Sequence, residues 1–166
     1  MAKQLTAEDA RQSLLAHVEA KGLEAYLKFG PVMDGAALQR LLADRAFVRY
    51  PCEIVFDAGP LEPGEFAVPL PKGERPEDGF TMVVHPCFEQ NVDHLAYAVL
   101  YQLVPVNYGE FASADEAETF GAAALGLTRD EYYDALCDIS DQLGATVPEL
   151  NPADLPGCGG GGCTCG

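Results

Sequence analysis

The chain has 166 residues, 48% of them hydrophobic, which is enough for one compact domain with a buried core. Its formal net charge of −16 would repel phosphate backbones and anionic membranes. We therefore expect neither nucleic acid nor a membrane as a partner, whereas the acidic surface favours a basic one.

Two helices are predicted at the start of the chain. Thr6 followed by Asp9 resembles a capping box, and apolar residues recur after it at helical spacing. A second helix is expected from Asp34, with three leucines on one face, and it should end before Tyr50-Pro51.

The middle of the chain changes to short β-branched or aromatic runs at 52–58, 65–70 and 80–85, which Gly- and Pro-rich segments separate. These runs predict a small sheet. Prolines at 69 and 71 restrict the second run to a sheet edge, because proline cannot donate a hydrogen bond to a neighbouring strand.

A central helix is predicted from about Val92 to Val104, where the sequence is hydrophobic nearly all round and should be buried. Ser113 with Glu116, and Thr128 with Glu131, mark the starts of two further helices.

The sequence thus predicts an α+β fold of about five helices packed on a small sheet. This globular domain should cover residues 1–146, and residues 147–166 should form a linker and a flexible tail rich in cysteine and glycine.

The chain contains six cysteines, and the chemistry expected of them depends on the cellular compartment. No apolar stretch of about 18 residues occurs, and the N-terminal MAKQLTAEDARQ lacks the apolar centre of a signal peptide. These features predict a cytoplasmic protein. In that reducing compartment we expect buried thiols, metal ligands or redox groups rather than a disulfide framework.

The final segment PGCGGGGCTCG contains Cys158, Cys163 and Cys165 among six glycines. Thiolates bind zinc, copper(I) or the iron of an iron–sulfur cluster, and glycine lets the backbone approach such a centre closely. Three thiolates leave one coordination position open, through which a recipient protein could take the metal. We therefore expect a non-enzymatic accessory or carrier protein that uses these three cysteines as metal ligands.

Three other interpretations of the tail remain open. Its neighbouring thiols could pass a disulfide by exchange. The tail could be the substrate of a modifying enzyme, in which case the protein is a precursor and its globular part serves for recognition. It could also be a disordered end with incidental cysteines.

A second candidate site lies in HPCFEQNVDH, which contains His85, Cys87, Asp93 and His94. The first two follow a predicted strand and the last two open the central helix, so all four could converge on a metal with mixed ligands. The alternative function is then a small metal-dependent hydrolase or a thiol redox protein. The competing interpretation is structural: Asp93 caps the helix, and Cys87 and His94 are packed or hydrogen-bonded.

The run DHLAYAVLY followed by ADEAETFGAAALGL resembles the two helices of small gluzincin metallopeptidases. In that family HExxH stands on a central helix, and a later glutamate, in a run similar to EAxxFAAxLL, supplies the third zinc ligand. The resemblance covers about residues 34–137 and implies a zincin-like fold.

The resemblance also implies that the catalytic motif is lost. Asp93 stands where the first histidine would be, His94 where the general-base glutamate would be, and Tyr97 where the second histidine would be, with Glu116 or Glu118 as the later carboxylate. Two histidines four residues apart hold the zinc in HExxH, and the glutamate activates water. This chain therefore resembles a degenerate metallopeptidase without peptidase chemistry, in which Glu116 is a further candidate ligand.

Overall fold

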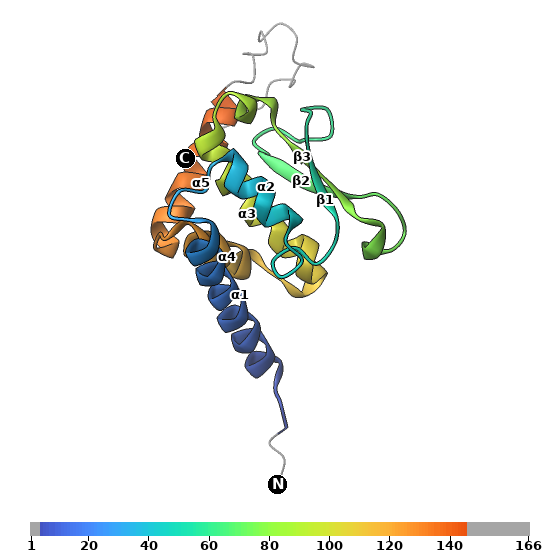
Figure 1. The fold of residues 1–166 in the computed structure, drawn as a ribbon, viewed down its shortest axis with the longest axis vertical. Helices are drawn as coiled ribbons and strands as arrows, with labels where there is room; N and C mark the ends of the chain where they lie inside the picture. The colour runs from blue at the N-terminus through green and yellow to red at the C-terminus, as the bar shows by residue number, and fades with distance from the viewer. Residues whose placement is uncertain (1–3, 146–166) are drawn as a thin grey trace, which may run out of the picture.

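The structure is a computed structural model that describes residues 4–145 (Figure 1). Within this range it contains five α-helices and one three-stranded sheet, which confirms the predicted α+β class. The helices are α1 (Ala7–Phe29), α2 (Gly35–Ala43), α3 (Val92–Tyr108), α4 (Ala114–Leu125) and α5 (Arg129–Ala145). The strands are β1 (Cys52–Phe56), β2 (Ala67–Pro71) and β3 (Phe80–Val84). The predicted linker and tail lie outside the described residues.

The helix starts follow the predicted capping residues. Reciprocal hydrogen bonds between a hydroxyl residue and an acidic residue three positions later form the caps Thr6–Asp9, Ser113–Glu116 and Thr128–Glu131. Asp34 caps α2 by accepting a hydrogen bond from the backbone N–H of Ala37 at 2.8 Å. Each cap satisfies backbone donors that the first helical turn leaves unpaired, so the local sequence fixes where these helices begin.

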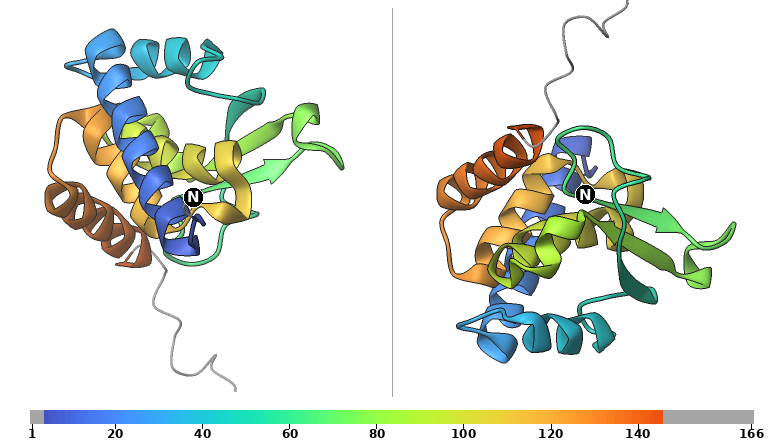
Figure 2. Two further views of the ribbon diagram at one scale, coloured as in Figure 1. Left: turned by 90° about the horizontal axis from the view of Figure 1, so that it is seen from below. Right: turned by 90° about the horizontal axis from the view of Figure 1, so that it is seen from above.

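The sheet has the order β1-β3-β2 and lies to one side of the helices (Figure 2). β1 runs parallel to β3, and β2 runs antiparallel to it. The edge position predicted for β2 is confirmed: it carries Pro69 and Pro71, and within the described residues it pairs with β3 alone.

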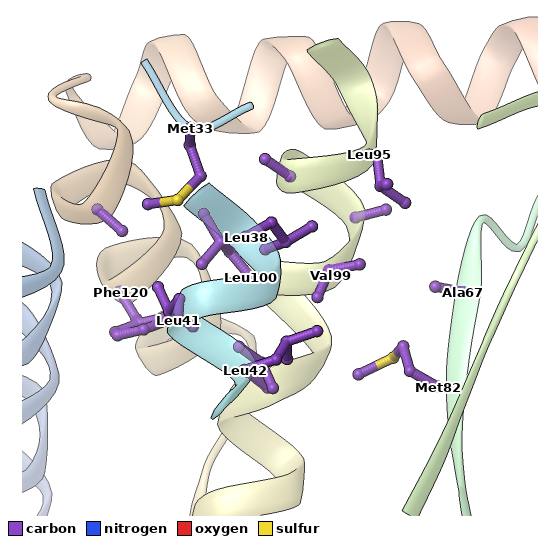
Figure 3. Packing of buried hydrophobic residues seen from close by; sticks show 14 of the residues in the cluster. Met33, Leu38, Leu41, Leu42, Ala67, Met82, Leu95, Val99, Leu100 and Phe120 are labelled. Carbon is purple, nitrogen blue, oxygen red and sulfur yellow. The ribbon is translucent and has the colours of Figure 1, made fainter. Parts of the chain in front are cut away.

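The helix α3 is central, as predicted, because it contacts α2 and α4 as well as β2 and β3. Figure 3 shows Leu38 and Leu41 of α2 beside Leu100 of α3, with Met82 of the sheet on the other side of that helix. These four side chains are almost inaccessible to solvent. Burial of large aliphatic side chains stabilises such a core by about 1.5–3 kcal/mol each.

The helix α1 packs on α4 at Gly22, which is buried. A Cβ atom at this position would lie 2.6 Å from the Ala123 Cβ atom and 2.7 Å from the Phe120 carbonyl oxygen. Only glycine allows two helix backbones to approach this closely without a shift. The N-terminal part of α1 extends beyond the rest of the described structure (Figure 1).

Candidate functional site

The predicted metal ligands of the tail, Cys158, Cys163 and Cys165, lie outside the described residues.

His85 and Cys87 of the second candidate site lie together where β3 leads into a short 3-10 helix, Pro86–Glu89. The His85 side chain caps this helix, because its Nδ1 atom accepts a hydrogen bond from the backbone N–H of Cys87 at 3.2 Å. The Cys87 side chain is exposed. Since Nδ1 accepts this hydrogen bond, the proton of the neutral imidazole lies on Nε2, which can donate a hydrogen bond but in this tautomer has no free electron pair for a metal ion.

His94 lies in the first turn of α3, next to the exposed Asp93. Its Nδ1 atom is 3.0 Å from the side-chain amide nitrogen of Asn91, and its ring contacts Tyr97 edge to face at 6.1 Å between centroids. These contacts fit the structural interpretation of His94, in which the imidazole is packed and hydrogen-bonded locally. The expectation that Asp93 caps α3 is wrong, because the cap residue is Asn91. The Asn91 side chain makes no capping hydrogen bond.

The two histidines line different pockets, and Leu143 of α5 lines both. Cys87 and His94 line a pocket of about 150 Å³ against Leu143, and His85 lines another of about 230 Å³ on the same leucine. Among residues 4–145 no group of three or more His, Cys, Asp or Glu side chains is arranged to hold a metal ion. His85, Cys87 and His94 thus lie in one region of the described structure, but they are not arranged around a single metal position.

Glu116 is not part of this region. It is 1% exposed, and its carboxylate accepts hydrogen bonds from both the backbone N–H, at 2.7 Å, and the hydroxyl of Ser113. Burial acts to raise the pKa of this carboxyl, but the hydrogen bonds from Ser113 outweigh burial and lower it below its usual value. It lines a pocket beside Arg11 and Leu14 of α1, so the structure gives it a capping role instead of bringing it to His94.

The other positions named by the metallopeptidase resemblance are occupied by packing and ion-pair interactions. Tyr97 stacks on Tyr132, with 5.6 Å between ring centroids, and its carbonyl oxygen accepts a hydrogen bond from the Tyr132 hydroxyl at 2.7 Å. Glu118 pairs with Arg129, which also pairs with Asp115. These contacts join α3, α4 and α5.

Three of the six cysteines lie in the described residues, and all three are free thiols: Cys52, Cys87 and Cys137. Burial raises the pKa of Cys52 to about 11. Burial also raises the pKa of Cys87, whose side chain is nevertheless exposed. Cys137 hydrogen-bonds the Tyr133 side chain on α5, and this bond is the main cause that raises the pKa of that tyrosine.

We predict that iodoacetamide alkylates Cys87 at least about tenfold faster than Cys52 at pH 8, because the reagent attacks thiolates and access to Cys52 is restricted. The rate at Cys52 should keep rising with pH towards its pKa of about 11. Peptide mass spectrometry after timed quenching measures both rates. In denaturant the two cysteines should react alike, and equal rates in the folded protein would contradict the prediction.

Sequence reasoning missed a cleft that Phe66, Tyr101, Glu118, Tyr133 and Leu136 line, which we call the tyrosine cleft. Its volume is about 310 Å³. Its residues come from the loop before β2 and from α3, α4 and α5, which are far apart in the chain. No local pattern in the sequence reveals that Tyr101 and Tyr133 share a cavity, because they lie on different helices.

Comparison of the chain with protein-family models, with curated proteins and with solved structures finds no match. In the described part of the chain, none of the helices has the length and apolar character needed to cross a membrane.

Proposed function

We propose that the protein is a non-enzymatic accessory or carrier protein that holds a thiophilic metal ion or an iron–sulfur species on Cys158, Cys163 and Cys165. The observation that carries this proposal is the spacing C-x4-C-x-C of these cysteines among six glycines. Thiolate ligands select zinc, copper(I) or iron–sulfur clusters.

The incomplete ligand set supports a carrier rather than a structural site. A structural zinc site normally closes with four protein ligands, and this segment supplies three. The fourth position can then accept a ligand from a recipient protein during transfer. The formal charge of −16 favours a basic recipient and disfavours nucleic acid and membranes as partners. Free thiols persist in a reducing compartment, which supports a cytoplasmic location.

Metal protection of thiols tests this proposal. The reduced full-length protein is incubated with one equivalent of Zn(II) or with none, treated with iodoacetamide and digested for peptide mass spectrometry. Zinc should slow alkylation of the three tail cysteines at least about tenfold, because a metal-bound thiolate is a poor nucleophile. Cys87 is the internal control, because it is exposed and should react at the same rate in both samples.

The same measurement separates the alternatives. Protection of Cys87 instead of the tail would favour a metal site near His85 and His94. A mass change confined to the tail before any treatment, in protein isolated from its native host, would identify a precursor changed by a modifying enzyme. Tail cysteines that alkylate equally fast with and without zinc would contradict the carrier proposal.

A further inference from the structure

The tyrosine cleft has the size and lining of a small-ligand site. Its volume of about 310 Å³ lies within the usual range for such sites. The rings of Phe66 and Tyr101 meet edge to face at 5.9 Å between centroids, and the Tyr133 side chain, 52% exposed, stands at the cleft as well. Helices α4 and α5, which carry part of the lining, lie side by side (Figure 2).

The charged groups of the cleft are acidic. Glu65 and Glu118 line it, and its described lining contains neither lysine nor arginine. The Arg129 Nε–H donates a hydrogen bond to Oε2 of Glu118 at 2.9 Å, and Nη2 of Arg129 forms an ion pair with the same oxygen at 2.8 Å. Within residues 4–145 no donor pairs with the second oxygen, Oε1. Every buried polar side-chain atom of the described residues has a partner, so the unpaired Oε1 atom is not buried, and solvent or a ligand can reach it.

Aromatic faces and a carboxylate attract the same kind of ligand. The negative face of a tyrosine or phenylalanine ring attracts an organic cation, and a carboxylate adds a charge-assisted hydrogen bond. Burial, with Glu118 adding to it, raises the pKa of Tyr101, so this hydroxyl stays uncharged near neutral pH and offers a hydrogen-bond donor and acceptor. An anionic ligand would meet two carboxylates without a lining cation.

We propose that the tyrosine cleft binds one organic cation, an alkylammonium or guanidinium group, with its charged end at Glu118 Oε1 and its aliphatic stem against the rings of Phe66, Tyr101 and Tyr133. This inference goes beyond the metal-carrier proposal and does not depend on the tail. The cation is either a free amine or a basic side chain of a partner protein, since both present the same chemistry.

Nuclear magnetic resonance titration of the ¹⁵N-labelled full-length protein tests the proposal with n-butylammonium as the probe and n-butanol as its neutral match. Butylammonium should shift the amide resonances of Gly64, Ala67 and Cys137, which line the cleft. Butanol at the same concentration should shift them little. Equal shifts with both probes, or shifts outside the cleft, would overturn the proposal.

Two variants should change the affinity for butylammonium in opposite directions. Glu118→Gln should weaken butylammonium binding about fivefold or more, because the charged acceptor is lost. Arg129→Gln should strengthen it about threefold, because removal of the guanidinium frees the Glu118 carboxylate and takes away a competing cation. Both variants lose the Arg129 pair, so a purely structural effect would weaken binding in both, and that result would overturn the proposal.

A control variant and a second probe complete the experiment. Glu19→Gln changes the net charge as Glu118→Gln does, but it lies on α1 outside the cleft, so binding should stay within about twofold. The tripeptide acetyl-Gly-Lys-Gly-amide distinguishes the two sources of the cation. Binding about tenfold tighter than butylammonium would identify a partner's basic side chain, and equal or weaker binding a free amine.

Discussion

Gly121→Ala should destabilise the protein by about 3 kcal/mol, although it adds one methyl group. Gly121 lies on α4 against the ring of Tyr132 on α5. A Cβ atom at this position would lie 2.6 Å from Tyr132 Cε1 and still closer to Cζ and the hydroxyl oxygen. Such distances require the ring or a helix to move.

The surroundings of Tyr132 prevent an inexpensive movement of the ring. Its side chain is completely buried, it stacks on Tyr97 with an interplanar angle of 15°, and its hydroxyl donates to the Tyr97 carbonyl oxygen. Displacing it would break this hydrogen bond and open the contact between α3 and α5. Packing at native density leaves no free volume to absorb the methyl group.

Denaturant unfolding monitored by circular dichroism measures the effect, and Gly144→Ala is the matched control. Gly144 is exposed on α5, and a Cβ atom there would meet no described atom within 4 Å. The control should therefore be stabilised by about 0.5 kcal/mol, as expected for alanine in place of glycine in a helix. If both substitutions have the same sign and size, the close contact with Tyr132 does not govern stability.

Asn107→Ala should also destabilise the protein by about 3 kcal/mol, because it leaves the buried Phe47 carbonyl oxygen and the partly buried Arg49 N–H without partners. Asn107 is buried near the end of α3. Its side-chain amide donates to the Phe47 carbonyl oxygen at 2.7 Å, and its side-chain oxygen accepts from the Arg49 backbone N–H at 2.8 Å. These two bonds fix the irregular segment between α2 and β1 to the central helix.

Asn107→Asp distinguishes the donor from the acceptor. The aspartate keeps an acceptor for Arg49 but, when ionised, presents a negative charge to the Phe47 carbonyl oxygen. We expect it to be at least as destabilising as alanine at pH 7, and less so at pH 4, where a protonated carboxyl can donate. Urea unfolding of wild type and variant at each pH measures this difference. A difference that does not change with pH would show that the donated bond contributes little.

Helix starts could be predicted from the sequence because their signals are local. In the caps Thr6–Asp9 and Ser113–Glu116 both partners lie within three residues, so the sequence places them together before any tertiary structure forms. The edge position of β2 followed in the same way from its prolines.

Contacts between distant segments could not be predicted in this way. The parallel pairing of β1 with β3 joins Cys52 to Phe80, and no periodicity in either strand specifies that partner. Asn107 reads as one polar residue in an apolar helix, since its partners lie about 60 residues earlier. The tyrosine cleft depends on four segments at once.

The candidate site shows the same limit. The sequence correctly grouped His85 with Cys87, because a separation of two residues at the end of a strand keeps them close. The sequence predicted Glu116 both as a helix cap and as a metal ligand. Its hydrogen bonds from Ser113 show the capping role. Sequence spacing alone could not show that His85 and His94 line different pockets, each of which includes Leu143 of α5.

Native mass spectrometry of the full-length protein, purified without oxygen, tests the metal-carrier proposal most directly. The wild-type chain should carry the added mass of one metal ion or one iron–sulfur species. A variant with Cys158, Cys163 and Cys165 all replaced by serine should lose that mass, while a variant with Cys52, Cys87 and Cys137 replaced should keep it. A wild-type chain without added mass, or a tail variant that retains its metal, would contradict the proposal.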